Sequence, residues 1–496
     1  MLRASKRIGV VSLVSRYWRD LVEKSACLWT DISGHDYRRY IKKSLFKSRG
    51  LLIDIHYMAF GPYRPHMNLT PHLNIVLRQL SRCRSITLIT ETCDFGTFWQ
   101  VFDKIQRWPA PFLESLTLKG AASRRRSYWA GYRDNFPKLP GTPAFPKLRC
   151  LEVDGVPCNL SPPGLKFSNV LSLNLVEVES VSMEQLLDVF RNSPFLERLE
   201  LGGTPDDSLS QEMVPPVHLP RLKAFHLIFQ YISVSNFFLS TIHAPNCSEI
   251  FISAYIPDYL NDGLRRHLFT RSTDHFSPVL QKLLTRGLYN DIELSGRDGQ
   301  LPEFRVRFHD KDSDEAGDKG FLQFQFRFDR IQPIEETVHW LASYFKGSSP
   351  KIPTRLHFTK NFEEVRLMDI IEPYTSVTHF AIRILFNAPS NPILAHLAQP
   401  TSLGWPLPDL EDFTYGRPTK GEPPDEVLLD MLRRRYGSSS EQIGIKHARP
   451  RPLKRIRLVF RRRKDISMDL LDKVHEILPT AEMFVDFEPD DSNSIW

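Results

Sequence analysis

An apolar triplet that recurs along the chain constrains the fold more than any other feature of the sequence. In each copy an apolar residue is followed by a second three positions later and by a third two positions after that. Seven early copies begin at Cys83, Leu113, Leu148, Val170, Leu196, Leu222 and Cys247. The steps between their first residues are 30, 35, 22, 26, 26 and 25 positions. A spacing of this kind predicts a repeat architecture, in which each unit packs mainly against its neighbours.

The spacing within the triplet predicts a short strand in every unit. Residues two apart, such as Leu116 and Leu118, point to the same face of a strand. Several units follow a proline, which ends the preceding segment and favours extended backbone. These prolines are Pro111, Pro146, Pro194 and Pro220. Residues 182–190 carry apolar side chains at helical steps and are predicted to form a helix between two strands.

Later copies of the triplet begin at Val377, Leu410 and Leu453, with longer steps of 33 and 43 positions. Between residues 253 and 376 the rhythm is weak. Apolar residues alternate there over 304–308 and 322–328, which predicts two strands of a hairpin inserted in or beside the array. A separate small domain at about 290–345 is the alternative.

The acids between these two strands resemble a calcium-binding loop at first sight. Asp310, Asp312 and Asp314 alternate, but Glu315 and Phe321 stand where such a loop needs Gly and Glu. We therefore expect a solvated hairpin loop and no metal site.

Residues 5–24 are predicted to form one helix with two apolar stripes. The stripes consist of Ile8, Val11, Val14, Trp18, Leu21 and Val22, and of Val10, Leu13 and Tyr17. Such a helix needs cover on two sides, so we expect Trp18 to be buried and Trp18→Ala to cost about 3–5 kcal/mol. The alternatives are a helix that only caps the repeat array and a mitochondrial transit peptide, since five Lys and Arg precede the first acid, Asp20.

The segment VSLVSRYWRDLVEKSACLWTDI (11–32) resembles the second half of an F-box. Val14, Trp18 and Leu21 match the helix pattern "LxxVCxxWxxLa" of that family, and the following Leu28 and Trp29 match "ppLWxxidl". The opening stretch of the family pattern, "LPxEllxxIfxxL", would fall upstream of Met1, so the resemblance implies a partial F-box at 1–33. It assigns to the F-box core or to adaptor binding Val11, Leu13, Val14, Tyr17, Trp18, Leu21, Leu28 and Trp29.

With the repeats included, the chain resembles fungal-type F-box proteins with irregular leucine-rich repeats. The resemblance implies an α/β fold, in which a short helical F-box remnant precedes an irregular, horseshoe-shaped solenoid over 34–496. It implies a non-catalytic substrate-recognition subunit of a cullin–RING ubiquitin ligase, which binds a Skp-type adaptor and captures a protein substrate. The alternative is a leucine-rich-repeat scaffold that no longer binds the adaptor.

In such a solenoid, residues that alternate with the strand anchors line the concave surface. Five polar residues of the middle units are our candidates for substrate binding, against the alternative of an ordinary solvated face. They are Glu152, Asp154, Asn174, Glu200 and His226.

Motifs that carry chemistry are missing from the sequence. It contains no GxxxxGK[ST], GxGxxG, HExxH or GxSxG. The six cysteines form no CxxC pair, which argues against a zinc site or a disulfide framework and favours a reducing compartment. We therefore expect a protein without enzymatic activity, cofactor or membrane span, located in the cytoplasm, the nucleus or both.

A basic stretch at 446–464 holds ten Lys and Arg, although the net charge of the whole chain is only +7. Ile456, Leu458 and Phe460 alternate within it, which predicts a strand with charges on one face. Three interpretations remain open: a solvated face, a nuclear-import or acidic-partner site, and binding to nucleic acid.

Overall fold

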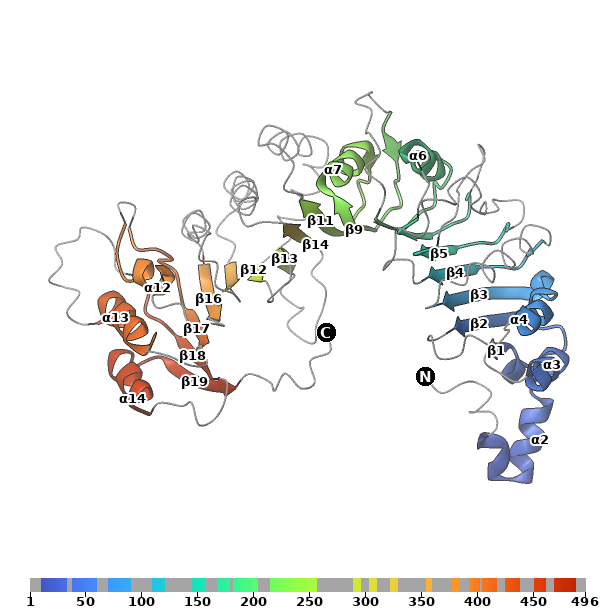
Figure 1. The fold of residues 1–496 in the computed structure, drawn as a ribbon, viewed down its shortest axis with the longest axis horizontal. Helices are drawn as coiled ribbons and strands as arrows, with labels where there is room; N and C mark the ends of the chain where they lie inside the picture. The colour runs from blue at the N-terminus through green and yellow to red at the C-terminus, as the bar shows by residue number, and fades with distance from the viewer. Residues whose placement is uncertain are drawn as a thin grey trace. The chain divides into compact units, whose positions relative to one another are not determined.

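The computed structural model places the chain in two compact units, Met1–Ser248 and Glu249–Trp496. Each unit is mixed α/β and is built on a mainly parallel sheet (Figure 1). The structure describes residues 10–33, 38–59, 70–90, 109–120, 145–156, 167–178, 182–203, 215–256, 289–295, 303–309, 322–328, 354–358, 377–383, 392–401, 404–416, 424–437, 450–460 and 468–487.

The sheet of the first unit contains eight parallel strands in the described part of the chain. Strands that follow one another along the chain are neighbours in this sheet. The strands are β1 (Asp31–Ser33), β2 (Ile53–Ala59), β3 (Cys83–Thr90), β4 (Ser115–Gly120), β5 (Cys150–Asp154), β6 (Ser172–Val176), β7 (Arg198–Gly202) and β9 (Ala224–Tyr231). Two short strands, β8 (Val217–His218) and β10 (Ile242–His243), pair in a small parallel sheet of their own.

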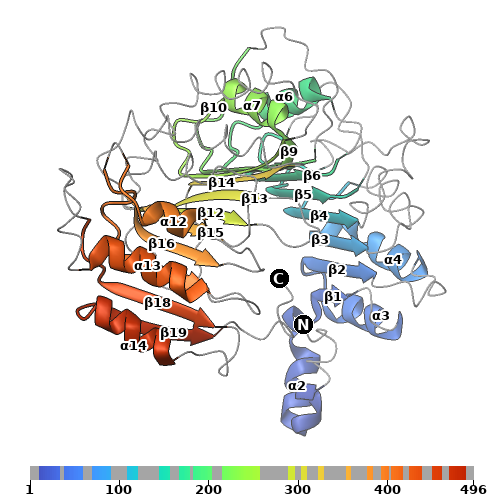
Figure 2. The same cartoon turned by 60° about the vertical axis from the view of Figure 1, so that its left-hand side comes forward.

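The first two helices of this unit precede β1 in sequence, and the others lie between strands. They are α2 (Arg16–Lys24), η1 (Ala26–Trp29), α3 (Arg38–Lys47), α4 (Thr70–Leu77), η2 (Leu80–Arg82), α6 (Met183–Arg191) and α7 (Ile232–Thr241). α3 and α4 lie beside each other next to β1–β3 (Figures 1 and 2). α6 confirms the helix predicted after β6, and Ser182 and Gln185 form a reciprocal capping box at its start.

The predicted strand anchors are confirmed, since every residue of the ten triplets is buried. The register aligns like positions of successive units, so that Leu173 of β6 lies between Leu151 and Leu199. Each anchor therefore packs against the equivalent anchors of the units before and after it. The same buried anchors therefore produce both the repeat in the sequence and the alignment of strands in the sheet.

A turn before the strand adds a fourth buried position that the triplet does not include. The N–H of Leu222 donates to the carbonyl of Leu219 at 3.2 Å, and the N–H of Leu113 donates to Ala110 at 3.1 Å. Pro220 and Pro111 follow the acceptor residues, where the fixed φ of proline suits the first central position of a tight turn. The prolines thus start the turns that lead into the strands.

The sheet of the second unit has the order β11-β14-β13-β12-β15-β16-β17-β18-β19. Its strands are β11 (Glu249–Ile256), β12 (Tyr289–Ser295), β13 (Glu303–His309), β14 (Leu322–Phe328), β15 (Thr354–Phe358), β16 (Val377–Arg383), β17 (Asp412–Gly416), β18 (Arg455–Phe460) and β19 (Glu482–Phe487). β12, β13 and β14 pair in antiparallel fashion, and the other pairs are parallel. β13 and β14 are the predicted hairpin strands; the acidic residues 310–314 between them lie outside the described residues.

Three helices of the second unit lie side by side next to β16–β19 (Figures 1 and 2). They are α12 (Pro392–Leu397), α13 (Pro424–Tyr436) and α14 (Met468–Ile477). The buried Arg435 of α13 donates to the backbone carbonyls of Leu397 and Leu407 and to the hydroxyl of Tyr436. This guanidinium therefore ties α13 to the end of α12 and to the turn before β17.

The N-terminal helix differs from the prediction. Residues 10–14 are helical, the helix breaks at Ser15, and α2 begins at Arg16, whereas residues 5–9 lie outside the described residues. Ser15 has extended backbone and its hydroxyl accepts from the N–H of Trp18 at 3.2 Å. A serine in this role starts a new helix, which explains why one continuous helix does not form.

Candidate functional site

Exposed apolar side chains gather on the N-terminal helical segment, and we call this set the apolar stripe. Its members are Val10, Val11, Leu13, Val14, Tyr17, Trp18, Leu21 and Leu28. They make up 8 of the 15 large apolar side chains that are exposed among the described residues. Single exposed apolar residues are ordinary, but a concentration of this kind makes the segment a candidate for an interaction surface.

Trp29 fastens this segment to the rest of the first unit. Its indole is only 2% exposed, and Nε1 donates to the carbonyl of Val22 at 2.8 Å. The ring packs on Tyr40 of α3, with centroids 5.6 Å apart, and Lys43 Nζ lies 4.9 Å from the ring centre. Glu23 of α2 also accepts hydrogen bonds from Lys43 and Lys47 of α3, so charge links the two helices. These hydrogen bonds hold the pKa of Glu23 below its usual value.

Trp18 is not buried, contrary to our expectation. Its side chain is 43% exposed, and Leu13 nearby is 77% exposed. The inward face of α2 is supplied by Val22, which is buried, while Trp18 and Leu21 of the F-box pattern are exposed. The expected loss of about 3–5 kcal/mol for Trp18→Ala applies to a core residue and therefore does not hold for this one.

A line of polar side chains crosses the sheet of the first unit, and we call it the polar row. The register aligns Thr117, Glu152, Asn174, Glu200 and His226 on β4, β5, β6, β7 and β9. The last four were predicted from the sequence as binding candidates, and the sheet brings them together. The fifth candidate, Asp154, lies two residues further along β5 and pairs in register with Lys119 rather than joining the row.

Hydrogen bonds and ion pairs connect the polar row from strand to strand. Thr117 Oγ1 donates to Glu152 at 3.2 Å, and Lys119 Nζ lies 2.7 Å from the same carboxylate. Asn174 Nδ2 donates to Glu200 at 2.9 Å, and His226 Nδ1 lies 3.6 Å from Glu200. Asn174 Oδ1 is buried and has no hydrogen-bond partner among the described residues.

The carboxylates of this face are in unequal environments. The interaction with His226, with a further hydrogen bond from Asn174, holds the pKa of Glu200 below its usual value despite partial burial. Burial raises the pKa of Asp154; Lys119 opposes this shift, and the charges of Glu152 and Glu200 add to it. Glu152, Asp154 and Glu200 all interact with Lys119, so acids outnumber lysines in this part of the face and it is suited to a partner with cationic groups.

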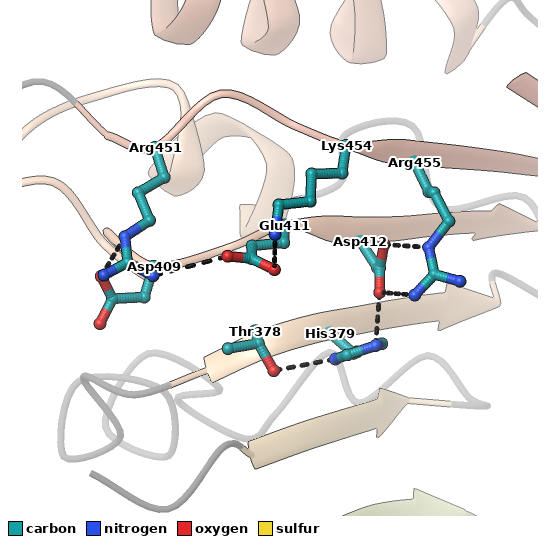
Figure 3. A network of polar contacts seen from close by, with 8 residues as sticks. All are labelled: Thr378, His379, Asp409, Glu411, Asp412, Arg451, Lys454 and Arg455. Carbon is teal, nitrogen blue, oxygen red and sulfur yellow. Dashed lines mark hydrogen bonds and ion pairs between the residues drawn. The ribbon is translucent and has the colours of Figure 1, made fainter. Parts of the chain in front are cut away.

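The second unit carries a corresponding line of ionic side chains, the charged row, on β16, β17 and β18 (Figure 3). The register aligns His379, Asp412 and Arg455. Arg455 binds both oxygens of Asp412 at 2.6 Å, His379 Nε2 contacts the same carboxylate, and Thr378 Oγ1 lies 2.8 Å from His379 Nδ1. Burial lowers the pKa of His379, and Asp412 opposes that shift.

Basic residues of the 446–464 stretch have carboxylate partners at several of their described positions. Besides Arg455, they pair as Arg451 with Asp409 at 3.2 Å, Lys454 with Glu411 at 2.8 Å and Arg457 with Asp486 at 3.2 Å (Figure 3 shows the first two). The predicted strand is β18, and these pairs favour the solvated-face interpretation for 450–460. Residues 446–449 and 461–464 lie outside the described residues.

The charged row was not predicted from the sequence, although a signal for it existed. His379, Asp412 and Arg455 each stand directly before the second anchor of a late triplet. In a strand, a residue beside an anchor points to the opposite face, so extending the alternation to the late units would have placed all three on one line of the sheet.

Comparison with known proteins gives no relative: neither the models of protein families nor the curated proteins contain a match to this chain. Among the described residues, no helix is long and apolar enough to cross a membrane. The same part of the chain contains no group of three or more His, Cys, Asp or Glu side chains arranged to hold a metal ion.

Proposed function

We propose that the chain is a non-catalytic substrate-recognition subunit of a cullin–RING ubiquitin ligase. In this proposal a partial F-box precedes an irregular leucine-rich-repeat solenoid, the apolar stripe binds a Skp-type adaptor, and the polar row receives a protein substrate. The observation that carries the proposal is the apolar stripe, because it leaves exposed most of the residues that match the F-box pattern.

The energetics of the apolar stripe favour a protein partner. Burying apolar surface contributes about 25 cal/mol for each Å² removed from water. Tyr17 and Trp18 are aromatic residues of the kind that dominate binding energy at protein interfaces. Because Trp29 already fixes the segment to α3, binding through the stripe would order little additional chain.

Co-purification with a co-expressed Skp-type adaptor tests this proposal. We expect the wild-type chain to retain the adaptor and the double variant Tyr17→Ala/Trp18→Ala to lose it, with affinity reduced at least about tenfold. Phe484→Ala is the matched control, because Phe484 of β19 is 40% exposed and lies outside the stripe. A wild-type chain that retains no adaptor would overturn the ligase role.

A second candidate function is an interaction scaffold that does not bind the adaptor. The polar row favours it, because the carboxylates of Glu152 and Glu200 could receive a cationic partner without any adaptor. For a partner captured by cross-linking, Glu152→Lys/Glu200→Lys should weaken binding, whereas Glu184→Lys on the exposed face of α6 should not. Equal binding by both variants would remove the row from partner recognition.

A further inference from the structure

Two histidines occupy the same position in successive repeats of the first unit. The segments Val217–Leu222 and Ile242–Cys247 read VHLPRL and IHAPNC, and each ends at the first anchor of a triplet. β8 and β10 pair in parallel, so His218 and His243 are direct neighbours across the small sheet. The repeat itself therefore places the two imidazoles together.

The geometry of the pair matches that of two ligands on one metal ion. The Nδ1 atoms of His218 and His243 lie 3.2 Å apart, and the ring centroids lie 5.1 Å apart. Two nitrogens bound to one tetrahedral Zn²⁺ at about 2.0–2.1 Å are separated by about 3.3 Å. Both side chains are exposed, so an ion can reach them from solvent.

We propose that His218 and His243 form a binding site for a divalent transition metal ion, coordinated through both Nδ1 atoms. Water completes the coordination, since no third His, Cys, Asp or Glu joins the pair among the described residues. Coordination through Nδ1 requires that each neutral imidazole carries its proton on Nε2. Nitrogen ligands favour Cu²⁺ over Ni²⁺ and Zn²⁺, and they disfavour Mg²⁺.

The backbone around the pair is held in place before any metal binds. Val217 and Leu219 are buried on either side of His218, and Ile242 and Ala244 are buried on either side of His243. The N–H of Leu219 also donates to the carbonyl of His243 at 3.0 Å. A bound ion would join two successive repeats, and it would therefore stabilise the folded chain by mass action.

Calorimetric titration of the full chain with CuCl₂, NiCl₂, ZnCl₂ or MgCl₂ alone tests the site. In His218→Gln and in His243→Gln, we expect the number of bound ions to fall by one or the affinity for that ion to fall at least about tenfold. Loss of a metal ligand costs at least as much affinity as loss of an outer-shell partner. His475→Gln, at an exposed position of α14 in the second unit, is the matched control and should bind like the wild type.

Thermal unfolding with and without CuCl₂ provides a second readout, which does not require the number of ions bound at other sites of the chain to be known. The metal should raise the melting temperature of the wild type and of His475→Gln more than that of either ligand variant. An equal rise in all four proteins, or titrations that do not distinguish them, would overturn the proposal.

Discussion

The N-terminal helical segment and the repeat strands use apolar residues in opposite ways. Every anchor of the seven early triplets is buried, whereas eight large apolar side chains between residues 10 and 28 are exposed. In the repeats each strand finds an equivalent strand on its flank, so the chain covers its own anchors. The apolar stripe has no equivalent packed on it among the described residues. Apolar periodicity thus reports that a face needs cover, but not which molecule provides it.

The largest effect should follow from truncating a strand anchor. Phe225 of β9 is among the largest fully buried side chains, and it pairs in register with Leu199. Phe225→Ala should lower the free energy of unfolding by about 3–5 kcal/mol, because a cavity replaces the ring. Denaturant unfolding measures this loss. A change below about 1 kcal/mol would mean that the repeat core is loosely packed.

The hydrogen bond that links Trp29 to α2 should be intermediate in its effect. Trp29→Phe keeps an aromatic ring but removes the Nε1–H that donates to the Val22 carbonyl. An unsatisfied buried group costs about 1–3 kcal/mol, so a destabilisation of that size is expected from urea unfolding. Phe112→Ala, at an exposed aromatic of a turn, is a suitable control. An equal loss in both would contradict the role of Trp29 as a fastening residue.

Glu200 of the polar row should account for part of the pH dependence of stability. The pKa of Glu200 is lowered in the folded chain from its ordinary value of 4.5. Its contribution is therefore fully present above that value and is lost as the pH falls through the lower folded pKa. The stability difference between wild type and Glu200→Gln should shrink as the pH is taken from about 7 to about 3. A difference that does not change with pH would show that the Glu200 charge does not stabilise the fold.

The smallest effect on stability is expected from Trp18→Ala. Its exposed ring contributes little to the fold, so the free energy of unfolding should change by about 0.5 kcal/mol or less in the same denaturant assay. A loss comparable to that of Phe225→Ala would restore the original expectation of a buried Trp18. It would also place the cover of the apolar stripe within the chain itself.

Much of the fold followed from the sequence, because the triplet is both a sequence repeat and a structural one. The anchors of β3 and β16, for example, were placed on the correct face although their sequence contexts differ. β1, β2, β12, β15 and β19 were not predicted. The residues of β19 are half-buried or exposed, as an edge strand permits, so its sequence lacks buried anchors. The break at Ser15 was missed because capping competes with a helical pattern that continues through it.

Apolar and polar spacing predicted only part of the candidate site. Glu152, Asn174, Glu200 and His226 were brought together because strand alternation and parallel register place them on one line. Burial of Trp18 could not be decided from its spacing, since a helix with two apolar faces does not reveal which face its own chain covers. The pairing of His218 with His243 depended on two-residue strands, which are too short to leave a periodic signal.

The turn before each strand has a consequence for how the chain reaches its fold. Each turn closes between residues three apart, and the first anchors of the unit's later repeats are separated by only 22–26 residues of sequence. The contact order of this region is therefore low for a protein with so large a sheet, and loop-closure entropy is lost in small steps. Folding can spread from any formed pair of repeats to the next. Insertions between strands lengthen a loop without shifting the register, so an array of this kind tolerates changes in length that a globular β-sheet would not.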